Sequence, residues 1–238
     1  MVAAWVAALP CVPRPPLSGG IAVAVTAASL PALLGQCQAY RRISVLPSCL
    51  IWGAMSHSQR VHSTNLFLMV GLPGAGKTTR AKELAVAHRA LRLTPDGWMI
   101  ALFDGTQPDG KRDLLEGLLI TVALQTLRLG TSVVLDFGLW SRDERSALRW
   151  LGRSAGAACQ VIYLPVDEAV QRARVAHRQA TTPYQTFPMS EADLDGWRTK
   201  FEEPDAAELD GGKIPGPPAR WQNWPEWAAD RWPSLTDS

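Results

Sequence analysis

Eight residues beginning at position 71 have the types and spacing that bind phosphate. Gly71 and Gly76 enclose four residues and are followed directly by Lys77 and Thr78, which matches the pattern G-x-x-x-x-G-K-[ST]. Glycines let the backbone wrap a phosphate with its N–H groups pointing inward, in conformations that a Cβ forbids. In this pattern the lysine reaches the β- and γ-phosphates, and the threonine hydroxyl takes a Mg²⁺ coordination position. The segment therefore predicts a site for a nucleoside triphosphate and Mg²⁺.

The surroundings of this Walker A pattern support the prediction. Chance alone would supply roughly 0.01 matches in a chain of this length. The apolar run 65–70 is typical of a strand buried on both faces, and a helix is predicted for 77–90 with its positive end directed at the phosphates. The apolar side of that helix is expected to consist of Ala81, Leu84, Ala85 and Val86. The residues predicted to bind the nucleotide are Gly71, Gly74, Ala75, Gly76, Lys77, Thr78 and Thr79.

Two aspartates follow predicted strands and are candidates for the chemistry. Asp136 ends the apolar run 131–136, at the strand end where open α/β sheets gather ligands, and it is predicted to hold Mg²⁺ together with Thr78. Its alternative role is to cap a turn. Asp96 follows the short strand predicted at 91–94 and could accept the proton of an attacking hydroxyl, although a simple Pro-Asp-Gly turn is equally compatible. The neighbouring Trp98 is expected in the core rather than stacked on a substrate.

Arginines on a later predicted helix, 167–180, could complete the site. Arg174 and Arg178 are four residues apart and so share one helical face, whereas Arg172 points elsewhere. This pair resembles a lid that closes over a triphosphate and stabilises the transition state, and a solvated basic helix is the alternative. Arg142 and Arg145 follow the strand of Asp136 and are expected mainly as ordinary surface residues, with a place at the substrate pocket as the alternative.

Strands and helices alternate through the body of the chain. An amphipathic helix is predicted at 112–129, another opens at the capping box of Ser141 and Glu144, a strand covers 159–164, and a helix covers 190–201. The apolar stripe of the first of these is expected to comprise Leu115, Leu118, Leu119, Val122 and Leu127. Alternation predicts a three-layer α/β fold with a mainly parallel sheet. Together with the Walker A pattern, it indicates a P-loop nucleoside-triphosphate hydrolase/kinase fold. No clear strand follows the arginine helix, where such a sheet usually ends.

The two ends of the chain differ in composition from the body. Residues 1–60 hold four arginines and no acid, whereas the rest holds 20 basic and 22 acidic residues. We expect 1–60 to be a leader without structural role, with translation beginning at Met55, or else a targeting or anchoring segment. The kinase-like domain is predicted at 64–209. Residues 210–238 are predicted as a Pro/Gly linker and a Trp-rich tail whose indoles fold back on an apolar face rather than form a binding surface.

The bulk composition sets further limits. A net charge of +2 does not indicate nucleic-acid binding, and the four cysteines show no metal-ligand spacing and are typical of a reducing compartment. The apolar run 21–34 is interrupted by Pro31 and falls short of a membrane span. We therefore expect a cytoplasmic protein with no stable membrane association. A GTPase is disfavoured because neither of the two asparagines precedes a lysine.

The motifs together resemble a family of small bacterial ATP-binding P-loop kinases, similar to chloramphenicol phosphotransferase, zeta-toxin kinases and the kinase part of polynucleotide kinases. The resemblance covers about 64–209. It implies that Lys77 and Thr78 bind ATP and Mg²⁺, that Asp96 activates the hydroxyl, and that Arg174 and Arg178 are lid arginines. It implies a hydroxyl-bearing acceptor, which we expect to be a small molecule. A polynucleotide 5′-end kinase and a non-catalytic nucleotide-binding module remain alternatives, with nucleic acid not favoured.

Overall fold

A computed structural model describes residues 64–235. Predictions about the leader at 1–60 and about translation from Met55 therefore lie outside the described residues. The boundaries of the predicted segments remain predictions.

The centre of the fold is a four-stranded parallel sheet. Its strands are β1 (Asn65–Val70), β2 (Leu91–Leu93), β3 (Val133–Gly138) and β4 (Ala158–Tyr163). They lie in the order β2-β3-β1-β4, so β1 is central and its carboxyl end leads directly into the glycine-rich loop. The pairing registers place Leu66 beside Val133 of β3 on one side and beside Cys159 of β4 on the other. This arrangement confirms the predicted α/β fold with a parallel sheet.

Helices alternate with these strands along the chain, as the sequence predicts. The helices are α1 (Lys77–His88), α2 (Pro95–Phe103), α3 (Lys111–Arg128), α4 (Arg142–Ser154), α5 (Glu168–Thr181), α6 (Glu191–Lys200), α7 (Ala206–Leu209) and α8 (Trp224–Arg231), with a 3₁₀ turn at Pro183–Gln185. Capping boxes open α4 at Ser141 and α6 at Ser190, where each serine hydroxyl accepts the backbone N–H three residues later. These caps fix where both helices begin.

The two faces of the sheet bury different side chains, because successive residues of a strand point to opposite sides. On one face Leu66, Leu68 and Val70 of β1 pack with α3, α4 and α8. On the other face Phe67 and Met69 pack with α1. The result is the three-layer order of helices, sheet and helices that the alternating sequence predicts.

Two predicted apolar stripes differ from the observed ones. In α1, Ala81 and Leu84 are buried as expected, but Val86 is exposed. In α3, Leu118 and Val122 are 54% and 42% exposed. The buried face of α3 consists of Leu115, Glu116, Gly117, Leu119, Ile120, Ala123, Leu124 and Leu127. This helix is apolar around most of its circumference, so spacing alone allows more than one stripe.

Helix α2 is absent from the predicted elements, and a Pro-Asp-Gly turn was one of two alternatives for its first residues. Pro95 occupies the first helical position, where the missing N–H costs nothing, and Asp96 lies in the first turn. Trp98 is 53% exposed, so the expectation that it lies in the core is wrong. The helix buries Met99 instead.

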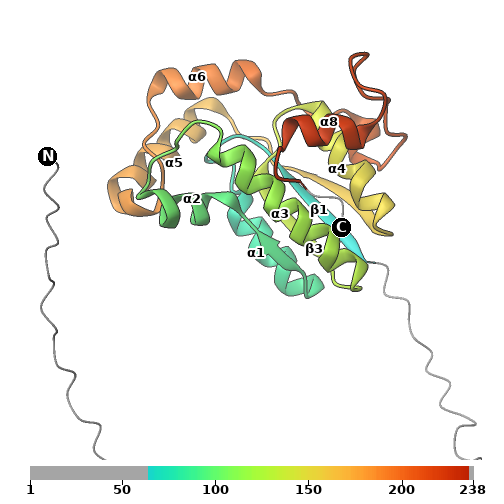
Figure 1. The fold of residues 1–238 in the computed structure, drawn as a ribbon. Coiled ribbons are helices and arrows are strands. Elements are labelled where there is room, and N and C mark those ends of the chain that lie inside the picture. The colour runs from blue at the N-terminus through green and yellow to red at the C-terminus, as the bar shows by residue number, and fades with distance from the viewer. Residues whose placement is uncertain (1–63, 236–238) are drawn as a thin grey trace, which may run out of the picture. The chain divides into compact units, whose positions relative to one another are not determined.

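The Trp-rich segment folds back on the domain. Trp224, Trp227 and Trp232 are all buried and belong to the same core as β1, α3 and α4. Neighbouring indoles meet edge to face, with ring centroids 5.7 Å apart from Trp224 to Trp227 and from Trp227 to Trp232. Figure 1 shows α8 lying beside α4. The preferred prediction for these tryptophans is thereby confirmed, and the alternative of an exposed binding surface is wrong for these three.

Strand β4 is an edge of the sheet, and within residues 64–235 no fifth strand follows α5. Helix α7 lies against β4 instead, and Phe201 stacks on Tyr163 with ring centroids 6.0 Å apart. In the described part of the chain no helix is long and apolar enough to cross a membrane.

Candidate active site

The glycine-rich loop connects β1 to α1 at the centre of the sheet. Gly71 has φ +147°, and a Cβ there would lie 2.7 Å from the Leu164 carbonyl oxygen, so only glycine fits without displacing the backbone. A Cβ on Gly74 would lie 3.2 Å from the Gln171 carbonyl oxygen of α5. The loop is therefore held tightly between the end of β4 and α5. The backbone N–H groups at the start of α1 lie at the same place, where a helix N-terminus favours an anion.

Lys77 occupies the first position of α1 and folds back over the loop. Its Nζ donates a hydrogen bond to the Leu72 carbonyl oxygen at 2.9 Å. Burial lowers the pKa of Lys77 to about 8, and the charges of Asp136 and Asp96 oppose this shift while those of Arg178 and Arg112 add to it. These four charged groups thus lie within electrostatic reach of one lysine.

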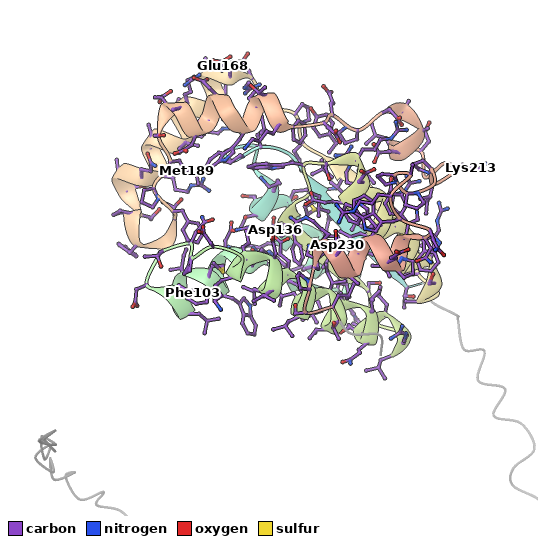
Figure 2. The ribbon with its side chains drawn as sticks, turned by 45° about the horizontal axis from the view of Figure 1, so that its top comes forward. Phe103, Asp136, Glu168, Met189, Lys213 and Asp230 are labelled. Atoms are coloured by element: carbon purple, nitrogen blue, oxygen red, sulfur yellow. The ribbon has the colours of Figure 1, made fainter. Side chains whose placement is uncertain are left out.

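Asp136 and Thr78 meet beside Lys77, as the sequence predicts. The Thr78 hydroxyl donates to Asp136 Oδ2 at 3.1 Å. The Asp136 side chain is only 2% exposed, and in the view of Figure 2 it lies near the middle of the molecule, to the right of Phe103, at the end of α2, and of Met189. Magnesium is usually held by one or two protein oxygens together with substrate phosphates. A hydroxyl and a carboxylate at the mouth of the phosphate loop fit such an ion.

Arg92 of β2 is a partner of Asp136 that sequence reasoning missed. Its Nε and NH2 groups donate to Asp136 Oδ2 at 3.2 and 2.7 Å. The pairing balances a carboxylate that would be costly to bury alone. Arg92 stands between two leucines in a three-residue strand, and a charge inside such a short apolar strand is the signal that could have indicated it.

Asp96 lies at the start of α2 and pairs with an arginine of α3. Arg112 NH1 donates to Asp96 Oδ1 at 2.9 Å, and the Asp96 side chain is 59% exposed. Asp96 is therefore close enough to Lys77 to act on its charge and open enough to meet a second substrate. Sequence reasoning did not single out Arg112, because its position in the first turn of a long helix is also typical of a solvated residue.

The two predicted lid arginines lie on α5 next to the loop. Arg174 NH1 donates to the Gly74 carbonyl oxygen at 3.1 Å, while Arg178 is near enough to Lys77 to lower its pKa. Arg172 points away, as predicted, and forms ion pairs with Glu168 and with Asp195 of α6. Arg174 thus contacts the glycine-rich loop, and the charge of Arg178 acts on Lys77. Their role as a lid remains a prediction.

Arg145 is neither a surface residue nor part of this site, so its predicted place is wrong. It is fully buried, and its Nε and NH2 groups each donate to a Glu208 carboxylate oxygen at 2.9 Å. Arg142 is exposed, as predicted, and pairs with Asp205 at 2.9 Å. The capping box fixed where α4 begins, but the later segment that covers its arginines is distant in sequence.

A shallow pocket of about 520 Å³ borders the loop on the side of Arg174. It is lined by Gly74, Ala75, Gly76, Thr79, Arg80, Glu83, Leu164 and Arg174. Four of these belong to the predicted nucleotide-binding set. The pocket lies where the part of a nucleotide beyond its phosphates could rest along the first turn of α1.

Comparison with known proteins places this geometry in a family. A family described as AAA domain matches residues 66–204. This match and the observed loop confirm the predicted resemblance to P-loop proteins. No curated protein matches the sequence.

Several solved structures are similar. A candidate kinase from Chloroflexus aurantiacus has 23% identity and a TM-score of 0.46, with 66% of this chain and 84% of that chain covered. A gluconokinase from Sinorhizobium meliloti has 17% identity and a TM-score of 0.43, with 74% and 93% covered. A chain of the Pnkp1/Rnl/Hen1 RNA repair complex has 16% identity and a TM-score of 0.48, with 58% and 44% covered. With TM-scores below 0.5, these similarities carry no argument about the substrate.

Proposed function

Because this chain belongs to the AAA domain family, matched over residues 66–204, we propose that it is an ATP-dependent kinase that transfers the γ-phosphate of ATP to a hydroxyl group of a small molecule. One observation carries the proposal. Two carboxylates and two arginines lie within electrostatic reach of Lys77, namely Asp96, Asp136, Arg112 and Arg178. Phosphoryl transfer depends mainly on positioning and on stabilising charge, which this cluster supplies.

The donor side of the site consists of the loop, Lys77, Thr78 and Asp136. The loop N–H groups and the Lys77 ammonium would bind the phosphates, since Lys77 Nζ already points back over the loop to the Leu72 carbonyl. Thr78 and Asp136 would hold Mg²⁺, which would supply positive charge to neutralise the phosphates. Arg178, whose charge acts on Lys77, would add positive charge at the transferred group.

The acceptor side consists of Asp96 and the arginine that binds it. One Asp96 oxygen is engaged by Arg112, and the other would accept the proton of the acceptor hydroxyl. The hydroxyl oxygen forms a bond to the γ-phosphorus while the bond from that phosphorus to the β–γ bridging oxygen breaks. The bonding electrons leave with ADP, and Asp96 receives the proton.

Two alternative functions account for fewer of the residues on the donor and acceptor sides of the site. A non-catalytic nucleotide-binding module would need Lys77 and Thr78 but has no use for a half-exposed carboxylate that Arg112 holds and whose charge acts on Lys77. A polynucleotide 5′-end kinase would use the same chemistry on a larger acceptor. Residues 61–238 carry 20 basic and 22 acidic side chains, which disfavours a strongly basic groove.

The test is a transfer assay with γ-labelled ATP and Mg²⁺. The protein is incubated with a pool of hydroxyl-bearing metabolites and, separately, with a 5′-hydroxyl oligonucleotide, and labelled products are identified by mass spectrometry. We expect a labelled small molecule whose formation is lost with Lys77→Ala. A labelled oligonucleotide alone would favour the polynucleotide kinase, and no labelled product from either pool would favour the non-catalytic module.

A further inference from the structure

The C-terminal segment docks on α3 one residue from a buried acid. Ser234 donates a hydrogen bond to the Leu114 carbonyl oxygen. A Cβ on Gly117 would overlap Ser234 and lie 2.9 Å from the Leu235 backbone nitrogen, so the close approach requires glycine there. Glu116 is the neighbour of this glycine and is only 6% exposed. The segment therefore binds α3 at a specific position, through a hydrogen bond and a close backbone contact, and not only through general apolar packing.

An unbroken series of polar contacts runs from this segment to Asp96. Trp232 Nε1 donates to Glu116 Oε2 at 3.2 Å, and Arg231 NH2 lies 3.9 Å from the same oxygen. The other oxygen of Glu116 accepts from Arg112 Nε at 2.9 Å. Arg112 NH1 then donates to Asp96 Oδ1 at 2.9 Å. Along this series burial decreases from a fully buried indole to a carboxylate at the surface of the site.

Arg231 is itself fixed by two further acids. Its Nε and NH2 groups donate to Glu144 Oε1 at 3.0 and 2.8 Å, and its NH1 lies 2.6 Å from Asp113 Oδ1. Glu144 is also the second member of the capping box that opens α4. Arg231, at the buried end of the series of contacts, thus links α3, α4 and α8.

We propose that Glu116 is a positioning residue for Asp96, and that Trp232 and Arg231 of the C-terminal segment hold it in place. The proposal rests on the proposed function, because it assigns an effect on transfer through Asp96. None of these three residues touches a reacting atom. Their effect reaches the acceptor hydroxyl through Arg112.

The physical reason lies in the exposure of Asp96. An ion pair between exposed, flexible side chains holds its geometry weakly, so the Asp96–Arg112 contact alone leaves the carboxylate several orientations. Glu116 fixes Arg112 through Nε, next to the group that binds Asp96, and a planar guanidinium transmits that orientation. Glu116 is fixed in turn because a buried carboxylate must keep its partners.

The C-terminal segment offers a matched pair of variants. Trp232→Phe removes the N–H that binds Glu116, whereas Trp224→Phe removes an N–H that binds the Pro215 carbonyl oxygen at 2.9 Å. Both tryptophans are buried in the same core, so we expect both changes to lower thermal stability. Only the first alters the contacts that lead to Asp96. If Trp232→Phe fails to fold, Glu116→Gln replaces it, since it keeps the shape of the side chain and removes its charge.

A spectroscopic measurement tests the coupling before any acceptor is known. In protein labelled with ¹⁵N-arginine, the Nε–H resonance of Arg112 is identified by its loss in Arg112→Lys. We expect Trp232→Phe to shift this resonance and Trp224→Phe to leave it in place. An Arg112 resonance unmoved by Trp232→Phe would overturn the proposal.

Kinetics then test the effect on transfer, with the acceptor found in the labelling assay. Trp232→Phe should lower kcat by about 10-fold with an unchanged KM for ATP, because small misplacements of a catalytic group have effects of this order. The decrease should vanish in an Asp96→Asn background, whereas a purely structural effect would persist there. Parental turnover in Asp96→Asn would reject the proposed role of Asp96. If Trp232→Phe keeps parental turnover while Asp96→Asn is slow, the positioning role of Glu116 is rejected and the proposed role of Asp96 stands.

Discussion

At the scale of single residues, the two aspartates of the site differ in their surroundings. Asp136 is almost fully buried and shares one oxygen with Thr78 and Arg92, whereas Asp96 is more than half exposed and binds only the outer part of Arg112. A buried carboxylate beside the phosphate loop suits a metal ligand, and an exposed one suits contact with a second substrate. The two carboxylates should therefore respond differently to the same substitution.

We predict that Asp96→Asn leaves ATP affinity nearly unchanged and lowers turnover by about 10²–10⁴, the usual contribution of a positioned base. Asp136→Asn should weaken the Mg²⁺ dependence of nucleotide binding as well as the rate. Calorimetry with and without Mg²⁺ and steady-state kinetics measure both effects. Equal behaviour of the two variants would contradict the assigned roles.

The lowered pKa of Lys77 predicts a proton uptake on nucleotide binding. With a pKa of about 8 in the free protein, Lys77 is about half neutral at pH 8. The phosphates favour its charged form, so binding at pH 8 should take up about half a proton, and affinity should fall as pH rises further. Calorimetry in two buffers of different ionisation enthalpy measures the uptake. Lys77→Arg is the control, because an arginine stays protonated and should take up none.

The same shift affects stability in the opposite pH sense. The unfolded chain retains the Lys77 proton up to its ordinary pKa of 10.5, whereas the folded protein loses it near 8. The contribution of this group to the free energy of unfolding therefore rises with pH between those values.

At the scale of elements, the alternation of strands and helices could be predicted from the sequence. Which face of each helix is buried could be predicted only in part. Local sequence patterns were enough to predict the glycine-rich loop, the strand that carries Asp136 and the capped helix α4. None of these patterns involves a residue distant in the sequence. The stripe of α3 could not be predicted in this way, because Leu118 and Val122 are as apolar as the buried residues. The close packing of the C-terminal segment at Gly117 helps to decide which face turns inward. Helix α2 was hidden by a Pro-Asp-Gly sequence that is equally typical of a turn.

The site residues that belong to motifs could be predicted from the sequence. Their ion-pair partners could not. Lys77, Thr78 and Asp136 come together because strands β1 and β3 are neighbours. The pairs Arg92–Asp136 and Arg112–Asp96 join side chains from different elements, which no spacing in the sequence reports. Arg112 and Glu116 are four residues apart on α3, a spacing that is also common in solvated helices. Arg145 was misplaced for the same reason, since Glu208 lies far along the chain.

The contact between α4 and α7 predicts a large but purely structural effect. Arg145 and Glu208 are both buried, so Arg145→Met leaves a buried carboxylate without its partner and should lower the free energy of unfolding by about 3–5 kcal/mol. Chemical denaturation measures this. The double variant Arg145→Met with Glu208→Leu should regain much of the loss, and failure to regain it would contradict the pairing. Nucleotide affinity should stay at the parental value, because neither residue touches the phosphate loop.

At the scale of the whole molecule, the last described segment of the chain helps to stabilise the domain. Residues Trp224–Trp232 complete the core on the face of α3 and α4, and their polar contacts lead back to Asp96. The Trp-rich segment is therefore part of the packed domain, although its composition differs from that of the body.

We predict that residues 1–54 are dispensable for the domain. A chain that begins at Met55 should match the full chain in melting temperature and nucleotide affinity, because residues 64–235 already contain the sheet, both helical layers and the phosphate loop. Thermal denaturation and calorimetry compare the two chains. A large loss of thermal stability in the shorter chain would show that the leader packs on the domain.

The central claim, that ATP binds with Mg²⁺ at the glycine-rich loop, is tested most directly by calorimetric titration of ATP and Mg²⁺ into the parent and into Lys77→Ala. Lys77 is the only residue changed, and we expect circular dichroism to show the same fold in both proteins. The account predicts saturable binding to the parent and no measurable binding to Lys77→Ala. Equal nucleotide affinity in the two proteins would contradict it.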